Sequence, residues 1–253
     1  MAKVKDRVGE INYNKFGSKM EIIACRGAND IDVYFEEYNW VCNNTWNNFK
    51  KGGIVCPYER RTCSVGFIGE GKYKPKENNK PTKVYSYWHH MMNRCYLFHE
   101  HNITYTDCLV DESWHNLQNY GKWFDDNYYE IEGEKMCLDK DILVKNNKIY
   151  SPSTCIFVPE RINTLFCKSK KSRGDLPIGV RWSKSKGKFE ANISIDNKQT
   201  YLGSFNTIEE AFQCYKTFKE NYIKQVADDY YSKGLIPKKL YDAMYKYEVE
   251  ITD

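Results

Sequence analysis

Several common signals are missing from this chain of 253 residues. No hydrophobic run approaches the about 20 apolar residues that span a membrane, and the polar beginning lacks the apolar stretch of a secretion signal. We therefore expect a soluble protein in the cytoplasm. The 10 cysteines include no Cys-x-x-Cys pair, a spacing typical of zinc and redox motifs, and cytoplasmic cysteines stay reduced. Most of them should be small core residues.

One stretch brings together the residue types that bind zinc. Cys95, His99, His101 and Cys108 offer two thiolates and two imidazoles, and zinc accepts this ligand set. The spacing matches no zinc finger. A structural zinc site and ordinary packing positions therefore both remain open.

Charge is segregated along the chain, although the net charge is only +4. Residues 111–141 contain nine acidic and three basic side chains, whereas residues 168–203 contain nine basic and three acidic ones. This segregation indicates separate modules. We expect an α+β protein of three modules, which span residues 1–75, 84–167 and 176–253.

The C-terminal module shows the clearest pattern. Residues 178–182, 188–195 and 199–205 each read as a strand, and turn residues separate them. Thr207 and Glu210 then have the spacing of a capping box at the start of a helix. Apolar residues follow at helical spacing and predict a face that covers one side of the sheet: Ile208, Ala211, Phe212, Tyr215, Phe218 and Tyr222.

The other side of this sheet is expected to be cationic. A cationic sheet suits a phosphate backbone, and arginine and tryptophan side chains can reach into a groove. A basic stretch at residues 167–175 precedes the sheet and could track phosphates. An ordinary solvated face remains the alternative. The residues expected to bind DNA are Arg181, Trp182, Lys184, Lys186 and Lys188 on the sheet, and Lys170, Lys171 and Arg173 before it.

Four short sequence motifs in this module resemble those of a known family. They are Gly-Val-Arg-Trp, Lys-Phe-x-Ala-x-Ile, Tyr-Leu-Gly-x-Phe and Glu-Glu-Ala-Phe, all between residues 179 and 212. They look like the Apetala-type domain of plant ethylene-response factors, which is also attached to phage HNH homing endonucleases. The resemblance implies a three-stranded sheet that lies in the DNA major groove.

The modules before it are less distinctive. Residues 19–25 and 30–35 predict a hairpin in a β-rich N-terminal module, and residues 72–83 read as a linker. Helical periodicity follows at residues 84–96 and 114–124. His89 and His90 are neighbours on the first of these helices and point to different sides, so they cannot serve one site together.

In the centre of the chain, the sequence predicts a strand at residues 136–142 and a turn at residues 145–148. A loop or return strand is predicted at residues 149–152, and a helix begins at residues 160–163. Two sequence motifs here resemble the central domain of phage HNH homing endonucleases. They are Leu-Asp-Lys-Asp-Ile and Tyr-Ser-Pro-Ser-Thr-Cys-Ile-Phe-Val-Pro. That resemblance implies a ββα-metal fold, a DNA phosphodiester as the substrate, and the host cell cytoplasm as the location.

The chemistry of this centre departs from the family pattern. The position of the general-base histidine is held by Lys140, and the flanking carboxylates of Asp139 and Asp141 favour the charged amine, which is a poor base. Asp139, Asp141 and Asn163 are the candidate ligands for Mg²⁺ or Mn²⁺. His115 is the one histidine close enough in sequence to be considered as a base. The alternative is that residues 139–141 are a surface strand or a salt-bridged structural remnant without catalysis.

These observations lead to one main expectation and two alternatives. We expect sequence-directed binding of double-stranded DNA by an HNH homing endonuclease-like protein, with metal-dependent cleavage if the centre is active. One alternative is a DNA-binding regulator without catalysis. The other is a phage inhibitor that captures a host defence protein through the acidic residues 111–141, which would mimic DNA.

Overall fold

The computed structural model describes residues 5–97, 105–167, 175–195 and 198–253. The chain divides into two compact units, Met1–Asp126 and Asn127–Asp253, and each is described by itself. Antiparallel sheets and separate helices make up both units, so the expected α+β class is confirmed. The boundary between the units falls inside the expected central module of residues 84–167. The division into three modules therefore stays a prediction.

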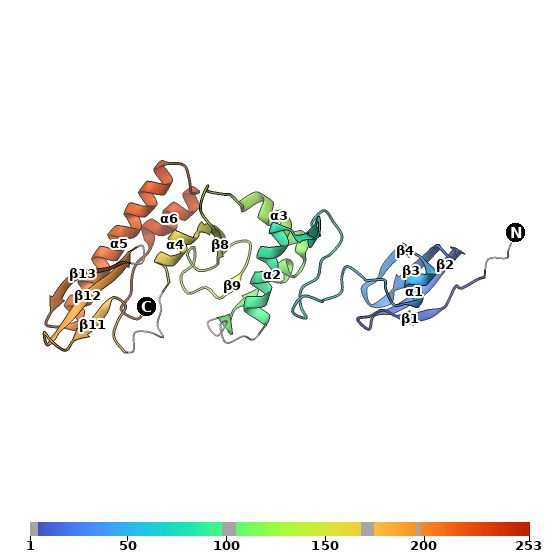
Figure 1. The fold of residues 1–253 in the computed structure, drawn as a ribbon, viewed down its shortest axis with the longest axis horizontal. Helices are drawn as coiled ribbons and strands as arrows, with labels where there is room; N and C mark the ends of the chain where they lie inside the picture. The colour runs from blue at the N-terminus through green and yellow to red at the C-terminus, as the bar shows by residue number, and fades with distance from the viewer. Residues whose placement is uncertain (1–4, 98–104, 168–174, 196–197) are drawn as a thin grey trace. The chain divides into compact units, whose positions relative to one another are not determined.

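A four-stranded antiparallel sheet opens the first unit, with its strands in sequence order (Figure 1). The expected hairpin is present, and every second residue of its second strand is buried, as one-sided burial of a sheet requires. The first and last strands were not predicted from the sequence. The bounds are β1 Ile11–Tyr13, β2 Lys19–Gly27, β3 Asp30–Phe35 and β4 Trp40–Asn44, with a 3₁₀ turn at Glu36–Tyr38 between the last two.

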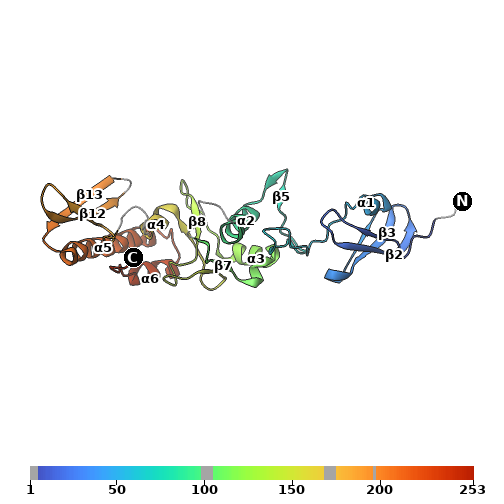
Figure 2. The same cartoon turned by 90° about the horizontal axis from the view of Figure 1, so that it is seen from below.

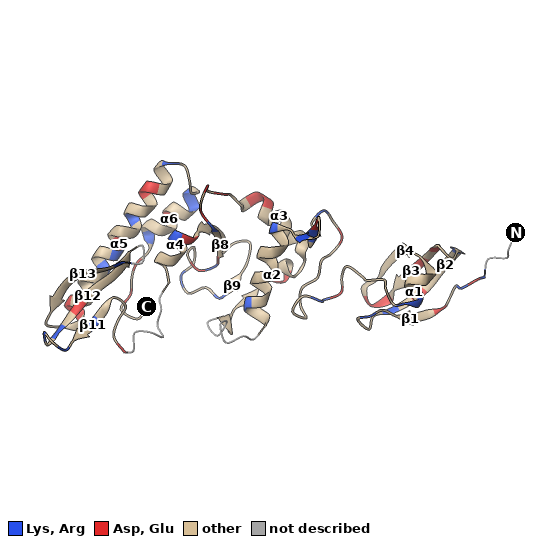
Figure 3. Cartoon of the chain, viewed as in Figure 1, with Lys and Arg blue, Asp and Glu red and all other residues tan. Residues whose placement is uncertain are grey.

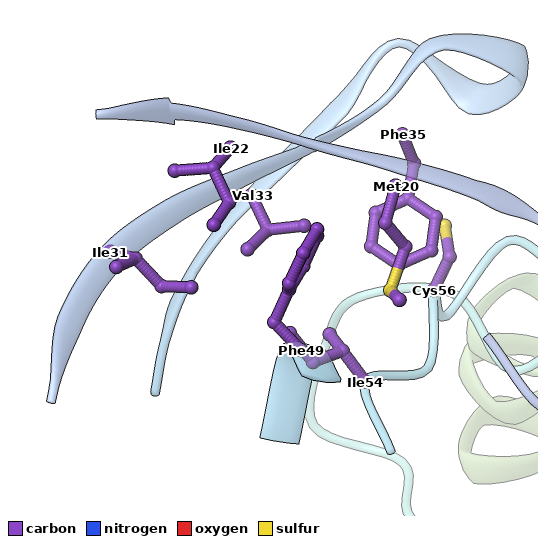
Figure 4. Packing of buried hydrophobic residues seen from close by; sticks show 8 residues of the cluster. All are labelled: Met20, Ile22, Ile31, Val33, Phe35, Phe49, Ile54 and Cys56. Atoms are coloured by element: carbon purple, nitrogen blue, oxygen red, sulfur yellow. The ribbon is translucent and has the colours of Figure 1, made fainter. Parts of the chain in front are cut away.

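One side of this sheet is closed by helix α1, Trp46–Lys50, and the loop after it. The hydroxyl of Thr45 accepts from the backbone N–H of Asn48 and caps the helix. Phe49 from the helix and Ile54 from the loop are buried against the strands (Figure 4). The core cluster consists of Met20, Ile22, Ile31, Val33, Phe35, Phe49, Ile54 and Cys56.

The rest of the first unit consists of loops around two helices. The expected linker contains a short hairpin, so it is more structured than its composition suggested. Thr82 caps the next helix, whose buried Trp88 donates its indole N–H to the carbonyl of Trp114 at 2.6 Å. The bounds are β5 Lys76–Glu77, β6 Lys80–Pro81, α2 Lys83–Tyr96, β7 Leu109–Val110, the 3₁₀ turn Glu112–His115 and α3 Leu117–Asn127.

The second unit begins with a small ββα arrangement. The expected strand at residues 136–142 ends early, at Asp139, because the carboxylate of Asp139 accepts from the backbone N–H groups of Asp141 and Ile142 and turns the chain. Its antiparallel partner is β10, which lies further along the chain than the return strand expected at residues 149–152. The bounds are β8 Met136–Asp139, β9 Ile149–Tyr150, β10 Ile156–Pro159 and α4 Glu160–Leu165.

The C-terminal sheet and helix follow the sequence pattern closely. Three antiparallel strands occur in sequence order, and Thr207 and Glu210 form the expected capping box. Helix α5 runs along one side of the sheet and continues past Tyr222 to pack on α6 (Figure 1, Figure 2). The bounds are β11 Val180–Ser183, β12 Lys188–Ile195, β13 Lys198–Phe205, α5 Ile208–Ser232 and α6 Lys238–Lys246.

The core of this region lies between the sheet and α5. It joins strand residues such as Ile193 to helix residues such as Phe212, and Val249 from the C-terminal stretch closes it. The opposite side of the sheet, which we call the outer face, carries no helix among the described residues of this unit. Among the described helices, none is both long and apolar enough to cross a membrane.

Candidate nucleic-acid interface and acidic centre

Strand register decides which side chains lie on the outer face. Arg181 pairs with Glu190, and Trp182 pairs with Phe189, which packs against the core. Because side chains alternate along a strand, Arg181 and Glu190 lie on the outer face while Trp182 lies on the core side. The expectation that Arg181 and Trp182 share one face is therefore wrong.

Trp182 is nevertheless accessible, because it belongs to β11, an edge strand. Its side chain meets the ring of Phe189 edge-on, with centroids 4.8 Å apart. The residue keeps 47% of its surface exposed. Trp182 can therefore contact a ligand only around the edge of the sheet, not through its outer face.

The centre of the outer face is a buried carboxylate held between two cations. Glu190 is 3% exposed. Its Oε2 accepts from Nε of Arg181 at 2.9 Å, and its Oε1 lies 2.9 Å from Nζ of Lys186. The hydrogen bonds from Lys186 and then Arg181 hold the pKa of Glu190 below its ordinary value. The same contact raises the pKa of Lys186. The carboxylate is thus ionised and fixes both cations.

A polar network extends from these ion pairs across the sheet. Nζ of Lys186 lies 4.9 Å from the ring centroid of Tyr201, and the Tyr201 hydroxyl is 2.8 Å from Oγ of Ser204. Asn192 pairs with Tyr201 across the strands. Its amide nitrogen is buried and has no hydrogen-bond partner within the described part of the chain. The outer face therefore offers a positive charge and an aromatic ring next to each other.

The remaining expected DNA contacts fall into two groups. Lys184 lies in the turn between β11 and β12 and Lys188 begins β12, and both are exposed. Figure 3 shows basic residues at this end of the sheet and acidic colour within it, where Glu190 is the one acidic residue of the sheet's described strands. Lys170, Lys171 and Arg173 lie outside the described residues.

The acidic centre is built around Asp139 at the end of β8. Its Oδ1 accepts from the backbone N–H groups of Asp141 at 2.8 Å and Ile142 at 2.7 Å. Burial, and then the charge of Asp141, raise the pKa of the Asp139 carboxyl to about 6. One carboxylate oxygen is thus already used by the turn that ends the strand.

Lys140 packs inward rather than pointing to solvent. It is 7% exposed, and its amine donates to Oδ2 of Asp141 at 3.1 Å. The amine also lies 5.8 Å from the ring centroid of Tyr150. The position at which we expected a general base therefore holds a buried, ion-paired ammonium.

Asn163, the third expected metal ligand, lies on α4. Its backbone carbonyl accepts from the N–H of Phe166 at 3.2 Å. Across the described ranges, no cluster of three or more His, Cys, Asp or Glu side chains could hold a metal ion. A site for Mg²⁺ or Mn²⁺ formed by Asp139, Asp141 and the amide of Asn163 stays a prediction.

Sequence reasoning missed a lysine of α5 that belongs to the same region. Lys219 is 8% exposed, and burial lowers its pKa. Its amine interacts electrostatically with the thiol of Cys167, whose pKa is raised by burial and by the charges of Asp139 and Asp141. The signal was present, because Lys219 follows Tyr215 by four residues and falls on the apolar stripe of the helix.

The histidines considered from the sequence occupy other places. His89 Nδ1 is 3.2 Å from the amide of Asn93, and burial lowers the pKa of His89. His115 contacts the Tyr96 hydroxyl at 3.2 Å. In the zinc candidate, His99 and His101 lie outside the described residues, while Cys108 is buried and Cys95 is partly buried.

The chain thus contains two arrangements of charged side chains, one on the outer face and one around Asp139. The first exposes cations on a sheet, and the second holds a partly buried acid and a buried lysine. Comparisons with protein-family models, with curated proteins and with solved structures found no match to this chain.

Proposed function

We propose that this chain binds double-stranded DNA through the outer face of the sheet β11–β13. The observation that carries the proposal is a sheet with one side packed on α5 and the other presenting cations. The side chain of Arg181 is 68% exposed although it is ion-paired. Exposed cations on an uncovered sheet attract the phosphates of a duplex and release its counterions.

The dimensions of the sheet are compatible with this binding mode. Adjacent strands lie about 4.8 Å apart, so three strands span about 10 Å between the outer backbones. The major groove of B-DNA is about 12 Å wide. The outer face can therefore enter the groove, with base edges in reach of its central side chains.

The outer face and the neighbouring edge of the sheet contribute groups with distinct roles in the proposal. Lys184 and Lys188, at the exposed end of the sheet, contact phosphates and set the position on the duplex. Arg181, nearer the middle of the strand, contacts base edges and contributes sequence preference. Trp182 contacts the sugar-phosphate backbone from the edge of β11.

The centre of the chain favours DNA binding without cleavage. Asp139 gives one oxygen to the turn, and Lys140 is ion-paired to Asp141, so the position expected for the general base holds an ammonium that accepts no proton. The alternative is metal-dependent hydrolysis with Mg²⁺ or Mn²⁺ held by Asp139, Asp141 and Asn163. In that case the metal would supply the activated water.

Two measurements test the proposal. Duplexes selected from a random pool by the pure protein should share a sequence, and Arg181→Gln should weaken binding to that sequence by about tenfold or more. Failure of the pure protein to retain any duplex at low salt would contradict the proposal. Incubation of the selected duplex with Mg²⁺ or Mn²⁺ should leave it intact, whereas nicks that vanish in Asp139→Ala would establish the nuclease alternative.

A further inference from the structure

A buried acid lies in the middle of the surface that we propose binds a polyanion. Glu190 belongs to the central strand β12 and its side chain is 4% exposed. A carboxylate in this place repels phosphate, so it opposes simple charge attraction to DNA. Its presence needs a reason beyond the packing of the sheet.

The contacts of this acid are divided between two cations. Nε and Nη2 of Arg181 lie 2.9 and 2.8 Å from Oε2. Nζ of Lys186 lies 2.9 Å from Oε1. One carboxylate therefore engages both cations, and the three side chains together carry one net positive charge rather than two.

This arrangement also orients the arginine. The edge of the guanidinium that contains Nε faces Glu190, so the Nη1 side remains for a ligand. A guanidinium held in this way donates in a fixed direction and recognises paired acceptors, such as those of a purine edge, better than a single phosphate. A lysine held by a carboxylate loses much of its attraction for phosphates of arbitrary sequence.

We infer that Glu190 is a specificity-determining residue, which suppresses binding to arbitrary DNA by neutralising Lys186 and by fixing Arg181. The inference rests on the proposed DNA binding. On a duplex of arbitrary sequence, both cations stay with Glu190. On the target, base acceptors meet the free side of Arg181 without breaking its ion pair.

The first test measures affinity for a scrambled duplex at several salt concentrations. Glu190→Gln keeps the shape of the side chain and frees the cations, so the slope of log K against log salt should steepen by about 0.9 for each freed cation. The ratio of target to scrambled affinity should fall. Asp242→Asn on α6 removes one carboxylate from the ion pair with Lys238 and is the control, with an unchanged slope and ratio expected.

A second test uses a double-mutant cycle with Lys186. In the native background, Lys186→Gln should change the slope for the scrambled duplex by less than about 0.3, because Glu190 already neutralises that lysine. In the Glu190→Gln background the same change should flatten the slope by about 0.9. A flattening of about 0.9 in the native background would overturn the inference, even if Glu190→Gln alone were to unfold.

The outcomes separate this inference from the proposed function. If the native protein binds no duplex, the proposed function itself is wrong. If it binds DNA, and a Glu190→Gln protein with native thermal unfolding shows the native slope and ratio, only the role of Glu190 is wrong.

Discussion

The amine of Lys140 lies 3.1 Å from Oδ2 of Asp141, and the lysine is buried while the side chain of Asp141 is 43% exposed. The stem of Lys140 should therefore stabilise the fold mainly by packing. Asp141 keeps enough contact with water for its carboxylate to be hydrated when the amine is removed.

Substitutions at Lys140 test this interpretation. Lys140→Met keeps the stem and should change the free energy of unfolding by less than about 1 kcal/mol, whereas Lys140→Ala should lower it by about 2 kcal/mol. Urea unfolding at neutral pH measures both. Equal destabilisation by the two variants would mean that the ammonium, rather than the stem, is needed.

The acid at the end of β8 predicts a pH dependence. Burial raises the pKa of Asp139 to about 6, so the folded state holds a proton that the unfolded chain releases near pH 4. Asp139 therefore favours folding below about pH 4, and this contribution to the free energy of unfolding is lost as the pH rises to about 6. Asp139→Asn keeps the Oδ1 acceptor and is neutral throughout.

This variant should match the native stability near pH 4 and exceed it by about 2 to 3 kcal/mol above pH 6.5. Urea unfolding curves at several pH values give the difference. A difference that does not change between pH 4 and 7 would show that Asp139 titrates normally in the folded protein.

Replacement of the buried Lys219 should change the stability of the fold with a different pH dependence. Its pKa is lowered by burial on the apolar side of α5, so protonation opposes folding. Lys219→Met should raise the free energy of unfolding by about 1 to 2 kcal/mol at pH 7. The gain should shrink as the pH approaches the ordinary lysine value of 10.5, where the amine of the unfolded chain is also neutral.

Lys224→Met removes a lysine from a half-buried position of the same helix and serves as the control, with a smaller gain at pH 7 expected. Loss of stability in Lys219→Met at pH 7 would contradict the claim that burial of the charged amine destabilises the fold. It would point instead to a partner that needs the ammonium.

The sequence predicted the C-terminal part of the fold well, because its signals are local. Alternation in residues 188–195, the turn after them and the spacing of Thr207 and Glu210 each depend on neighbours along the chain. The structure confirms β12 at these bounds and the capping box. The length of α5 was underestimated, because its last turns are buried against α6, which lies later in the sequence.

The site was harder to predict, because it depends on register and on distant contacts. Alternation along β11 already separates Arg181 from Trp182, but the sequence interpretation placed them on one face. The early end of β8 follows from a side-chain turn at Asp139 that periodicity does not show. The partner strand of β8 and the approach of Lys219 to Cys167 join segments that only tertiary packing brings together.

The central claim is that DNA meets the outer face of the C-terminal sheet, and fluorescence anisotropy of a labelled duplex tests it most directly. Replacing Arg181 and Lys188 together by glutamine should weaken binding by at least about tenfold near 0.1 M salt. Replacing Lys239 and Lys246 of α6 together by glutamine removes the same charge elsewhere and should change the affinity less than about threefold. Equal losses in the two double variants, both folded, would contradict a defined interface on this face.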